Sequence, residues 1–187
     1  MFEDNRSRKL ILVAHCVLNQ SSISDGTADF PSQFSEIVEL LMENQVGIIQ
    51  LPCPELTCLG LDRQDMAGAQ RELLGENTRI RGLMEEGHNV DRLRTKADDV
   101  ALEVNEYRRH GFEVLGLIGI NRSPSCGVET TSRNAREELG QGVFVNVIAE
   151  RLRAHGITLK MIGVKTSEVA GSLSRVRSLL ERGDGKE

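Results

Sequence analysis

The stretch VLGLIGINRSPSC, residues Val114–Cys126, contains an unbroken apolar run followed at once by a polar turn that ends in cysteine. A short apolar run bounded by turn residues is typical of a strand buried on both faces. Two earlier stretches have the same form, LILVAHC at 10–16 and VGIIQLPC at 46–53. Because the carboxyl ends of parallel strands open onto one edge of a sheet, we expect Cys16, Cys53 and Cys126 to gather there.

Segments with helical periodicity separate these apolar runs. Strands are predicted at 9–15, 46–51, 112–120 and 157–164. Helices are predicted at 31–44, 70–86 with breaks at Gly75 and Gly82, 89–110, 142–155 and 167–182, and residues 130–132 are expected to cap a further short helix. The segment 52–68 is expected to be a long irregular loop, and the GDGKE tail at 183–187 to lie beyond the last helix.

Alternating strands and helices predict βαβ units with right-handed crossovers. We therefore expect a Rossmann-like three-layer α/β sandwich with a mostly parallel sheet of about four or five strands. The chain has 187 residues and contains no repeat or linker, so residues 1–187 are predicted to form a single domain.

Composition narrows the class of partner. The net charge of −5 argues against a nucleic-acid scaffold, and an aromatic content of 3% leaves no platform for stacking bases. The first apolar run is too short for a secretory signal or a membrane span. We therefore expect a cytoplasmic protein, with neither nucleic acid nor membrane as partner. Cytoplasmic cysteines stay reduced, so these four are predicted to be ligands, nucleophiles or core residues.

The segment LPCPEL is predicted to hold Cys53 rigidly. Pro52 and Pro54 fix two φ angles, and each also pushes the residue before it toward extended geometry. If that geometry continues, Glu55 points to the same side as Cys53, where a carboxylate beside thiolates can donate or accept a proton. The alternative is a turn after the strand, with a buried cysteine and a solvated glutamate.

The turn INRSPSCG surrounds Cys126 with small hydrogen-bonding groups from Asn121, Ser123 and Ser125. Backbone N–H groups in such a turn can bind an anion and lower the pKa of a thiol. Arg122 lies in the same turn and is a candidate for binding the polar edge of a substrate. An ordinary type I or type II turn after a strand is the alternative interpretation.

Several other polar residues are expected to be structural. His15 should point away from Cys16 because side chains alternate along a strand. Arg63 and Asp62 could bind the polar edge of a substrate, but a pair between them at the surface is the favoured interpretation. Cys58 belongs to no recognised metal-ligand spacing, and its role stays open.

Three cysteines without a CxxC pair leave two metal interpretations. A structural zinc site needs four protein ligands, which usually come in paired arms. A [4Fe–4S] cluster on three thiolates keeps one iron open as a Lewis acid for substrate sulfur or oxygen. A non-catalytic thiol or metal protein, such as a sulfide carrier, a redox sensor or a zinc-stabilised module, is the competing hypothesis. No GxGxxG follows a strand and no GxxxxGK[ST] occurs, which disfavours nucleotide binding.

The combination of CPE at 53–55, SPSCG at 123–127 and an early cysteine resembles the 2-thiouracil desulfidase (TudS-type) family. The segment from the third strand to the fourth is similar to a branch of TudS-related desulfidases, and the whole resemblance spans residues 9–165. It implies an α/β enzyme with an oxygen-sensitive [4Fe–4S] cluster on Cys16, Cys53 and Cys126.

The same resemblance implies the chemistry. The sulfur of a thiocarbonyl substrate, a thiouracil-like base or a related thioamide, would bind the open iron, and water would replace it without net redox change. Glu55 and Ser123 are then the candidates for proton transfer and positioning. Ser125, Asn121 and Arg122 are the candidates for binding the substrate.

Overall fold

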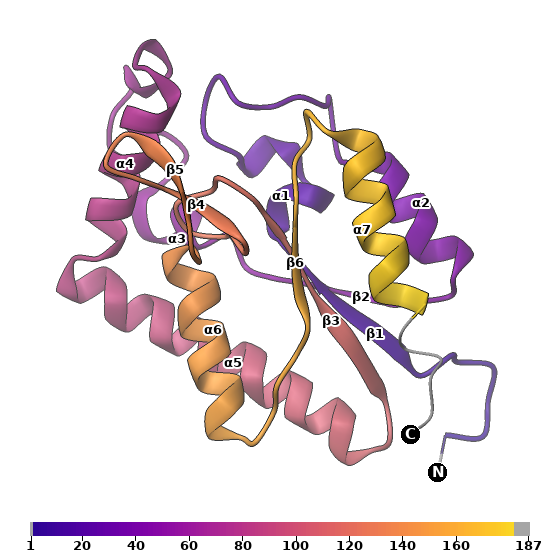
Figure 1. Ribbon diagram of the computed structural model, residues 1–187. Helices are drawn as coiled ribbons and strands as arrows, with labels where there is room; N and C mark the ends of the chain where they lie inside the picture. The colour runs from indigo at the N-terminus through magenta and orange to yellow at the C-terminus, as the bar shows by residue number, and fades with distance from the viewer. Residues whose placement is uncertain (1, 182–187) are drawn as a thin grey trace.

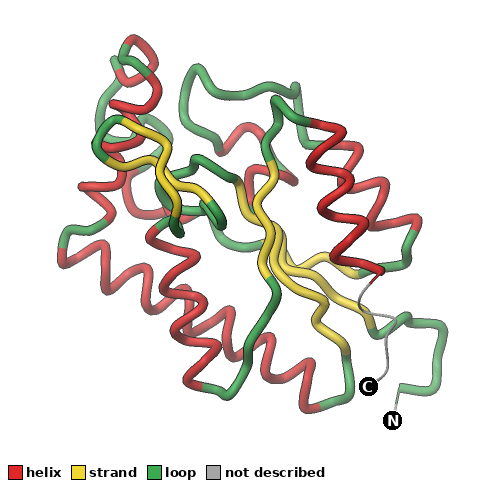
Figure 2. The backbone as a smooth tube through the Cα atoms, in the orientation of Figure 1, coloured by secondary structure: helices red, strands yellow, loops and turns green. Residues whose placement is uncertain are grey.

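The computed structural model describes residues 2–181 and has three layers, with a central sheet between two pairs of helices (Figure 1). The sheet is parallel throughout, in the order β2 (Gly47–Gln50), β1 (Lys9–Val13), β3 (Glu113–Ile120) and β6 (Met161–Val164). Helices α2 (Ser35–Glu43) and α7 (Val169–Glu181) cover one face, and α5 (Gly87–Arg109) and α6 (Val143–Ala154) cover the other (Figure 2). The predicted α/β sandwich with a parallel sheet is confirmed. The GDGKE tail lies outside the described residues.

Strand order determines where a ligand can enter. From β1 the chain moves to β2 on one side, whereas β3 lies on the other side of β1. In open α/β sheets such a reversal leaves a crevice outside the carboxyl ends of the strands. The segments that follow β1, β2 and β3, which carry the three cysteines, therefore leave the sheet at the same edge.

The sheet is held by apolar packing on both faces. Residues 11–13 of β1 and Leu117 and Ile118 of β3 have no exposed surface. Helix α5 presents one buried stripe at helical spacing, made of Leu93, Ala97, Val100, Ala101 and Val104. Each fully buried Leu or Val contributes roughly 1.5–3 kcal/mol, so this stripe fixes the helix on the sheet.

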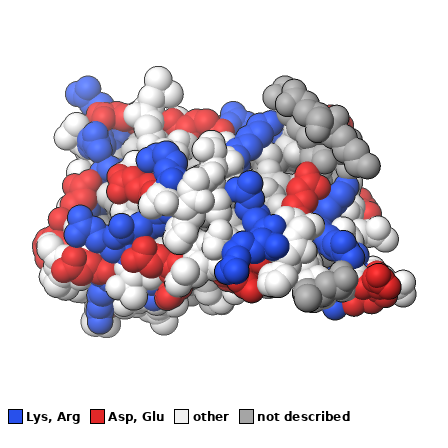
Figure 3. Space-filling model, turned by 90° about the horizontal axis from the view of Figure 1, so that it is seen from below, with Lys and Arg blue, Asp and Glu red and all other residues white. Residues whose placement is uncertain are grey.

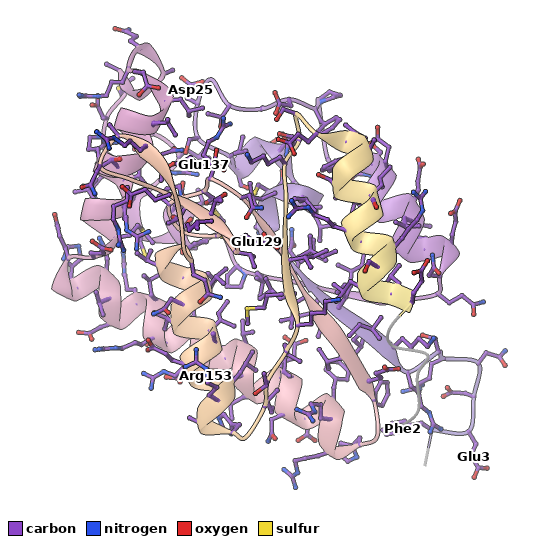
Figure 4. All side chains as sticks on the ribbon, in the orientation of Figure 1. Phe2, Glu3, Asp25, Glu129, Glu137 and Arg153 are labelled. Carbon is purple, nitrogen blue, oxygen red and sulfur yellow. The ribbon has the colours of Figure 1, made fainter. Side chains whose placement is uncertain are left out.

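A β-hairpin replaces the short helix expected at 130–132. Strands β4 (Thr130–Arg133) and β5 (Arg136–Leu139) pair antiparallel. Their turn residues Asn134 and Ala135 have φ angles of 53° and 52°, which is the left-handed pair that a tight type I′ hairpin turn requires. The predicted short helix is wrong because the turn stabilises strand pairing. Two glutamates labelled in Figure 4 join the hairpin region to β6 and the loop after it. Glu129 accepts the Gly163 N–H, and Glu137 is paired with Lys165.

Three other local expectations are wrong. Helix α4 (Leu73–Met84) runs through Gly75 and Gly82 without a break. A glycine costs a helix roughly 1 kcal/mol, less than the burial of Ile80 and Met84 returns. Helix α3 (Pro54–Leu59) lies within the segment expected to be irregular, with its proline at the favoured first position. Helix α1 (His15–Leu18) begins where the first strand was expected to continue.

The remaining short elements are the 3₁₀ turns η1 (Gln20–Ser22) and η2 (Gly68–Gln70). Lys and Arg side chains alternate with Asp and Glu over the face drawn in Figure 3. Within residues 2–181, no helix has both the length and the apolar character needed to cross a membrane.

Candidate functional site

A cavity of about 90 Å³ lies at the carboxyl edge of the sheet, where the segments after β1, β2, β3 and β6 meet. A water molecule needs roughly 10–15 Å³ of such space, so the cavity suits a small ligand. Every candidate site residue from the sequence lines it: Cys16, Cys53, Glu55, Asn121, Arg122, Ser123, Ser125 and Cys126.

Cys16 reaches the cavity from a helix and not from a strand. β1 ends at Val13, and the Ala14 N–H then donates to the Ile118 carbonyl at 2.8 Å, which fixes the start of α1 beside β3. Because α1 replaces strand alternation, His15 also lines the cavity, and the expectation that it points away is wrong. Burial raises the pKa of the Cys16 thiol to about 12, with the charges of Cys53 and Glu55 adding to the shift.

Cys53 is the N-cap of α3. Its sulfur accepts the Leu56 N–H at 3.4 Å and lies 3.9 Å from the Ser22 carbonyl oxygen. Burial raises the pKa of this thiol, the nearby Glu55 raises it further, and the bond from Leu56 opposes both. The chain therefore enters a helix at Cys53, so extended geometry is not what places Glu55 near the sulfur.

Cys126 is held by a turn that folds back on β3. Its carbonyl accepts the Ile120 N–H at 2.9 Å, and its own N–H donates to the Ser123 hydroxyl at 2.9 Å. A β-carbon on Gly119 would lie 2.4 Å from the Cys126 carbonyl oxygen, so only glycine permits this approach. Burial raises the pKa of Cys126 well above its usual value, and repulsion from Cys16 and Cys53 comes next as a cause.

Glu55 is buried in the first turn of α3 and is bound from three sides. Its Oε1 accepts the Ser125 hydroxyl at 2.5 Å. Its Oε2 accepts Arg63 Nε at 3.0 Å and the Ser24 hydroxyl at 3.2 Å. A carboxylate with this many donors is fixed in both position and rotation.

The two serines of the SPSC turn have different contacts. Ser125 Oγ touches Glu55 and also lies 3.7 Å from the Cys126 sulfur and 3.3 Å from Ser123 Oγ. Ser123 Oγ accepts the backbone N–H groups of Ser125 and Cys126. Ser125 thus binds the carboxylate directly, whereas Ser123 is connected to it only through Ser125.

Asn121 and Arg122 contribute to the site in different ways. Asn121 Oδ1 accepts three successive backbone N–H groups, of residues 128, 129 and 130, and so holds the loop after Cys126. Arg122 is half-buried with a φ of 71°. Over residues 2–181, neither a hydrogen bond nor an ion pair is found for its guanidinium, which leaves that group available to a ligand.

The prediction of a surface pair between Arg63 and Asp62 is wrong. Arg63 is 2% exposed and binds Glu55, whereas Asp62 accepts the Gln64 N–H at 3.0 Å. The φ angles of Arg63 and Gln64, 52° and 62°, turn the chain inward. Nothing in the sequence marks that turn, because neither residue is a glycine or asparagine.

Two further segments reach the cavity without any sequence signal. Asp29 lies in the loop after η1, and Lys165 and Thr166 follow β6. The Thr166 hydroxyl donates to the Asp29 carboxylate, which joins the two segments beside the cavity. Lys165 is paired with Glu137 at 2.9 Å.

Three of the four cysteines line the cavity, and no disulfide joins any of the four. All four cysteines are free, and Cys58 is buried in α3 away from the cavity lining. Among residues 2–181, no group of three or more His, Cys, Asp or Glu side chains is arranged around a single metal-ion position. Burial raises the pKa values of Cys16, Cys53 and Cys126, so these thiols would need a positively charged partner to bind as thiolates.

Comparison with known proteins places the chain in a family. No protein-family model matches it. A solved structure of the [4Fe-4S]-dependent thiouracil desulfidase TudS aligns with 91% of this chain and 99% of that chain, at 17% identity and a TM-score of 0.39, too loose a likeness to carry an argument. Uncharacterized protein MJ0003 of Methanocaldococcus jannaschii is 30% identical over 123 residues, which make up 66% of this chain and 70% of that protein. The chain belongs to the same family as this Methanocaldococcus jannaschii protein.

Proposed function

We propose that this protein is an iron–sulfur-dependent desulfidase that replaces the sulfur of a thiocarbonyl small molecule with oxygen from water. The substrate class is a thiouracil-like base or a related thioamide. The observation that carries the proposal is that three free cysteines, a buried carboxylate and two serines line one small cavity. The reaction converts a thiocarbonyl and water into a carbonyl and hydrogen sulfide, so electrons balance without a redox partner.

In this proposal Cys16, Cys53 and Cys126 hold a [4Fe–4S] cluster. A cluster on three thiolates supplies a Lewis acid that polarises the carbon–sulfur bond of the substrate. The thiols come from the segments that follow three strands, and burial raises the pKa of each. Cys58 takes no part, since it does not line the cavity.

The chain's own residues supply the proton path. Glu55 accepts a proton from the water that attacks the thiocarbonyl carbon and returns it to the departing sulfur. Ser125 relays this proton at Oε1 of Glu55, and Ser123 extends the path by one hydroxyl. Asn121 shapes the turn around the substrate, and the Arg122 guanidinium binds the polar edge of the substrate.

Anaerobic reconstitution with iron and sulfide tests this function. We expect about four irons and four labile sulfides per chain, and sulfide release from 2-thiouracil, 4-thiouracil or a simple thioamide. Cys126→Ser should abolish iron binding, whereas the matched control Cys58→Ser should keep it.

Glu55→Gln should keep the iron and lower sulfide release by about 100-fold or more. A protein that binds no iron, or zinc in its place, refutes the desulfidase. Full sulfide release by Glu55→Gln removes Glu55 from the proton path, and a wild type that releases no sulfide favours the non-catalytic thiol or metal protein.

A further inference from the structure

We propose that Arg63 is the positioning residue of this site: its guanidinium orients the Glu55 carboxylate toward Ser125 and holds the segment after Cys16 beside Cys53. The role of Glu55 in the reaction rests on the proposed function, whereas the contact itself does not. Arg63 is 2% exposed, so solvent does not compete for its donors.

All three guanidinium nitrogens are bound. Nε donates to Glu55 Oε2 at 3.0 Å, and Nη2 donates to the Ser22 carbonyl at 2.5 Å. Nη1 donates to the carbonyls of Gly60 and Leu61 at 2.7 and 3.2 Å, which anchors the group in its own loop. The planar fork of an arginine holds these partners in one fixed geometry, which a lysine cannot do.

The two oxygens of Glu55 are thereby given separate roles. Arg63 occupies Oε2, together with the weaker Ser24 hydroxyl, and leaves Oε1 to Ser125. The terminal torsion of a glutamate is broad, so without Arg63 the carboxylate would rotate away from Ser125. The direction of the carboxylate within the cavity therefore depends on Arg63.

The Nη2 group of Arg63 binds a carbonyl that lies next to the Cys53 sulfur. The Ser22 carbonyl that accepts Nη2 is also the group 3.9 Å from the Cys53 sulfur. Ser22 and Ser24 belong to the segment that follows Cys16, and both lie on the cavity wall. One side chain thus joins the carboxylate, this segment and a cysteine.

The loop that carries Arg63 is itself fixed. Arg79 Nη2 donates to the Arg63 carbonyl at 2.8 Å, and Arg79 is paired with the buried Glu76 at 2.6 Å. A left-handed φ at a bulky residue such as Arg63 persists only where its surroundings enforce it, and such positions cluster at functional sites. The loop is built to present the guanidinium inward.

A double-mutant cycle separates positioning from simple stabilisation. We expect Arg63→Gln to lower kcat by about tenfold with KM changed by less than about twofold, and Arg63→Lys to recover only part of the loss. In a Glu55→Gln background, Arg63→Gln should have no further effect on kcat. Arg71→Gln, an exposed arginine paired with Asp65 and Glu76, is the matched control and should keep wild-type kcat.

Two measurements on the metal-free protein do not depend on activity. The Arg63 Nε–H should exchange slowly with solvent by NMR in the wild type and at least about tenfold faster in Glu55→Gln. Cys53 should be alkylated at least about tenfold faster in Arg63→Gln than in the wild type, with Cys58 in each protein as the internal reference.

The outcomes distinguish the two proposals. Equal losses of kcat on Arg63→Gln in both backgrounds overturn the positioning role and leave the desulfidase standing. A wild type that binds no iron overturns the desulfidase, and the exchange and alkylation rates then decide the role of Arg63. If both rates are unchanged in the variants, the positioning role is wrong.

Discussion

Ser125 donates its hydroxyl proton to Oε1 of Glu55 over 2.5 Å, although 70 positions separate the two residues in sequence. Glu55 is in the first turn of α3 after β2, and Ser125 is in the turn after β3. The sheet order brings both segments to one edge, since only β1 separates β2 from β3. The short bond makes Ser125, and not Ser123, the first partner of the carboxylate.

The two serines should therefore differ on substitution. Ser125→Ala should lower kcat by about 100-fold with full iron content, because it removes the group bonded to Glu55. Ser123→Ala should instead destabilise the turn by about 1–3 kcal/mol and lower iron content, because two backbone donors lose their acceptor. Kinetics and iron analysis on both variants check this, and the reverse pattern contradicts the assigned roles.

Arg122 should act on substrate affinity. Arg122 lines the cavity and its guanidinium has no hydrogen bond or ion pair within residues 2–181, so Arg122→Gln should raise KM about tenfold and leave stability unchanged. Arg133→Gln, on the exposed end of β4, is the control and should leave KM as it is. Steady-state kinetics with thermal unfolding check the pair, and an unchanged KM in Arg122→Gln removes this residue from the substrate contacts.

Gly119 and Gly82 should respond to alanine in opposite directions. At Gly119 a β-carbon meets the Cys126 carbonyl oxygen at 2.4 Å, so Gly119→Ala should destabilise the fold by about 3 kcal/mol and reduce iron content. At Gly82 a β-carbon meets nothing within 4 Å on an exposed helix face, so Gly82→Ala should stabilise by about 0.5–1 kcal/mol. Urea unfolding measures both, and a tolerated Gly119→Ala disproves the close approach.

The hairpin should weaken at low pH through Glu137. The hydrogen bond from Thr130 holds the pKa of this carboxyl below its usual 4.5, and the bond and charge of Lys165 add to the shift. A lowered folded-state pKa gives stability that is present above the unfolded-state value and is lost as pH falls through the folded-state value. Wild type should therefore lose more stability than Glu137→Gln between pH 5 and pH 3, as measured by urea titration. If the free energy of unfolding falls equally in the wild type and in Glu137→Gln over this pH range, Glu137 does not cause the loss.

The sequence predicted the sheet edge well because apolar runs and strand ends are local signals. The runs at 10–16, 46–53 and 114–126 correspond to β1, β2 and β3 and the segments that follow them. All eight candidate site residues line the cavity at that edge. Their roles as ligands, acid–base groups or substrate contacts stay predictions.

The structural features that the sequence did not predict depend on backbone reversals and long-range contacts. The inward turn at Arg63 and Gln64 uses left-handed φ angles without glycine or asparagine, and the hairpin turn has asparagine at its first position but alanine at its second, so composition marks the first turn not at all and the second only in part. Cys16 follows a strand that ends three residues earlier than the cysteine, because Ala14 bonds to Ile118 of β3. Such a bond exists only once the sheet has formed.

The wide spacing of Cys16, Cys53 and Cys126 along the chain also determines when the site comes into existence. Two of these sulfurs follow β1 and β2, but the third is placed only when the turn after β3 docks against Gly119. A growing polypeptide therefore does not have all three thiols at one edge until that turn has been synthesised and folded. Any group that binds all three thiols binds the native state and stabilises it by mass action. Such a group therefore binds after folding and then raises the free energy of unfolding.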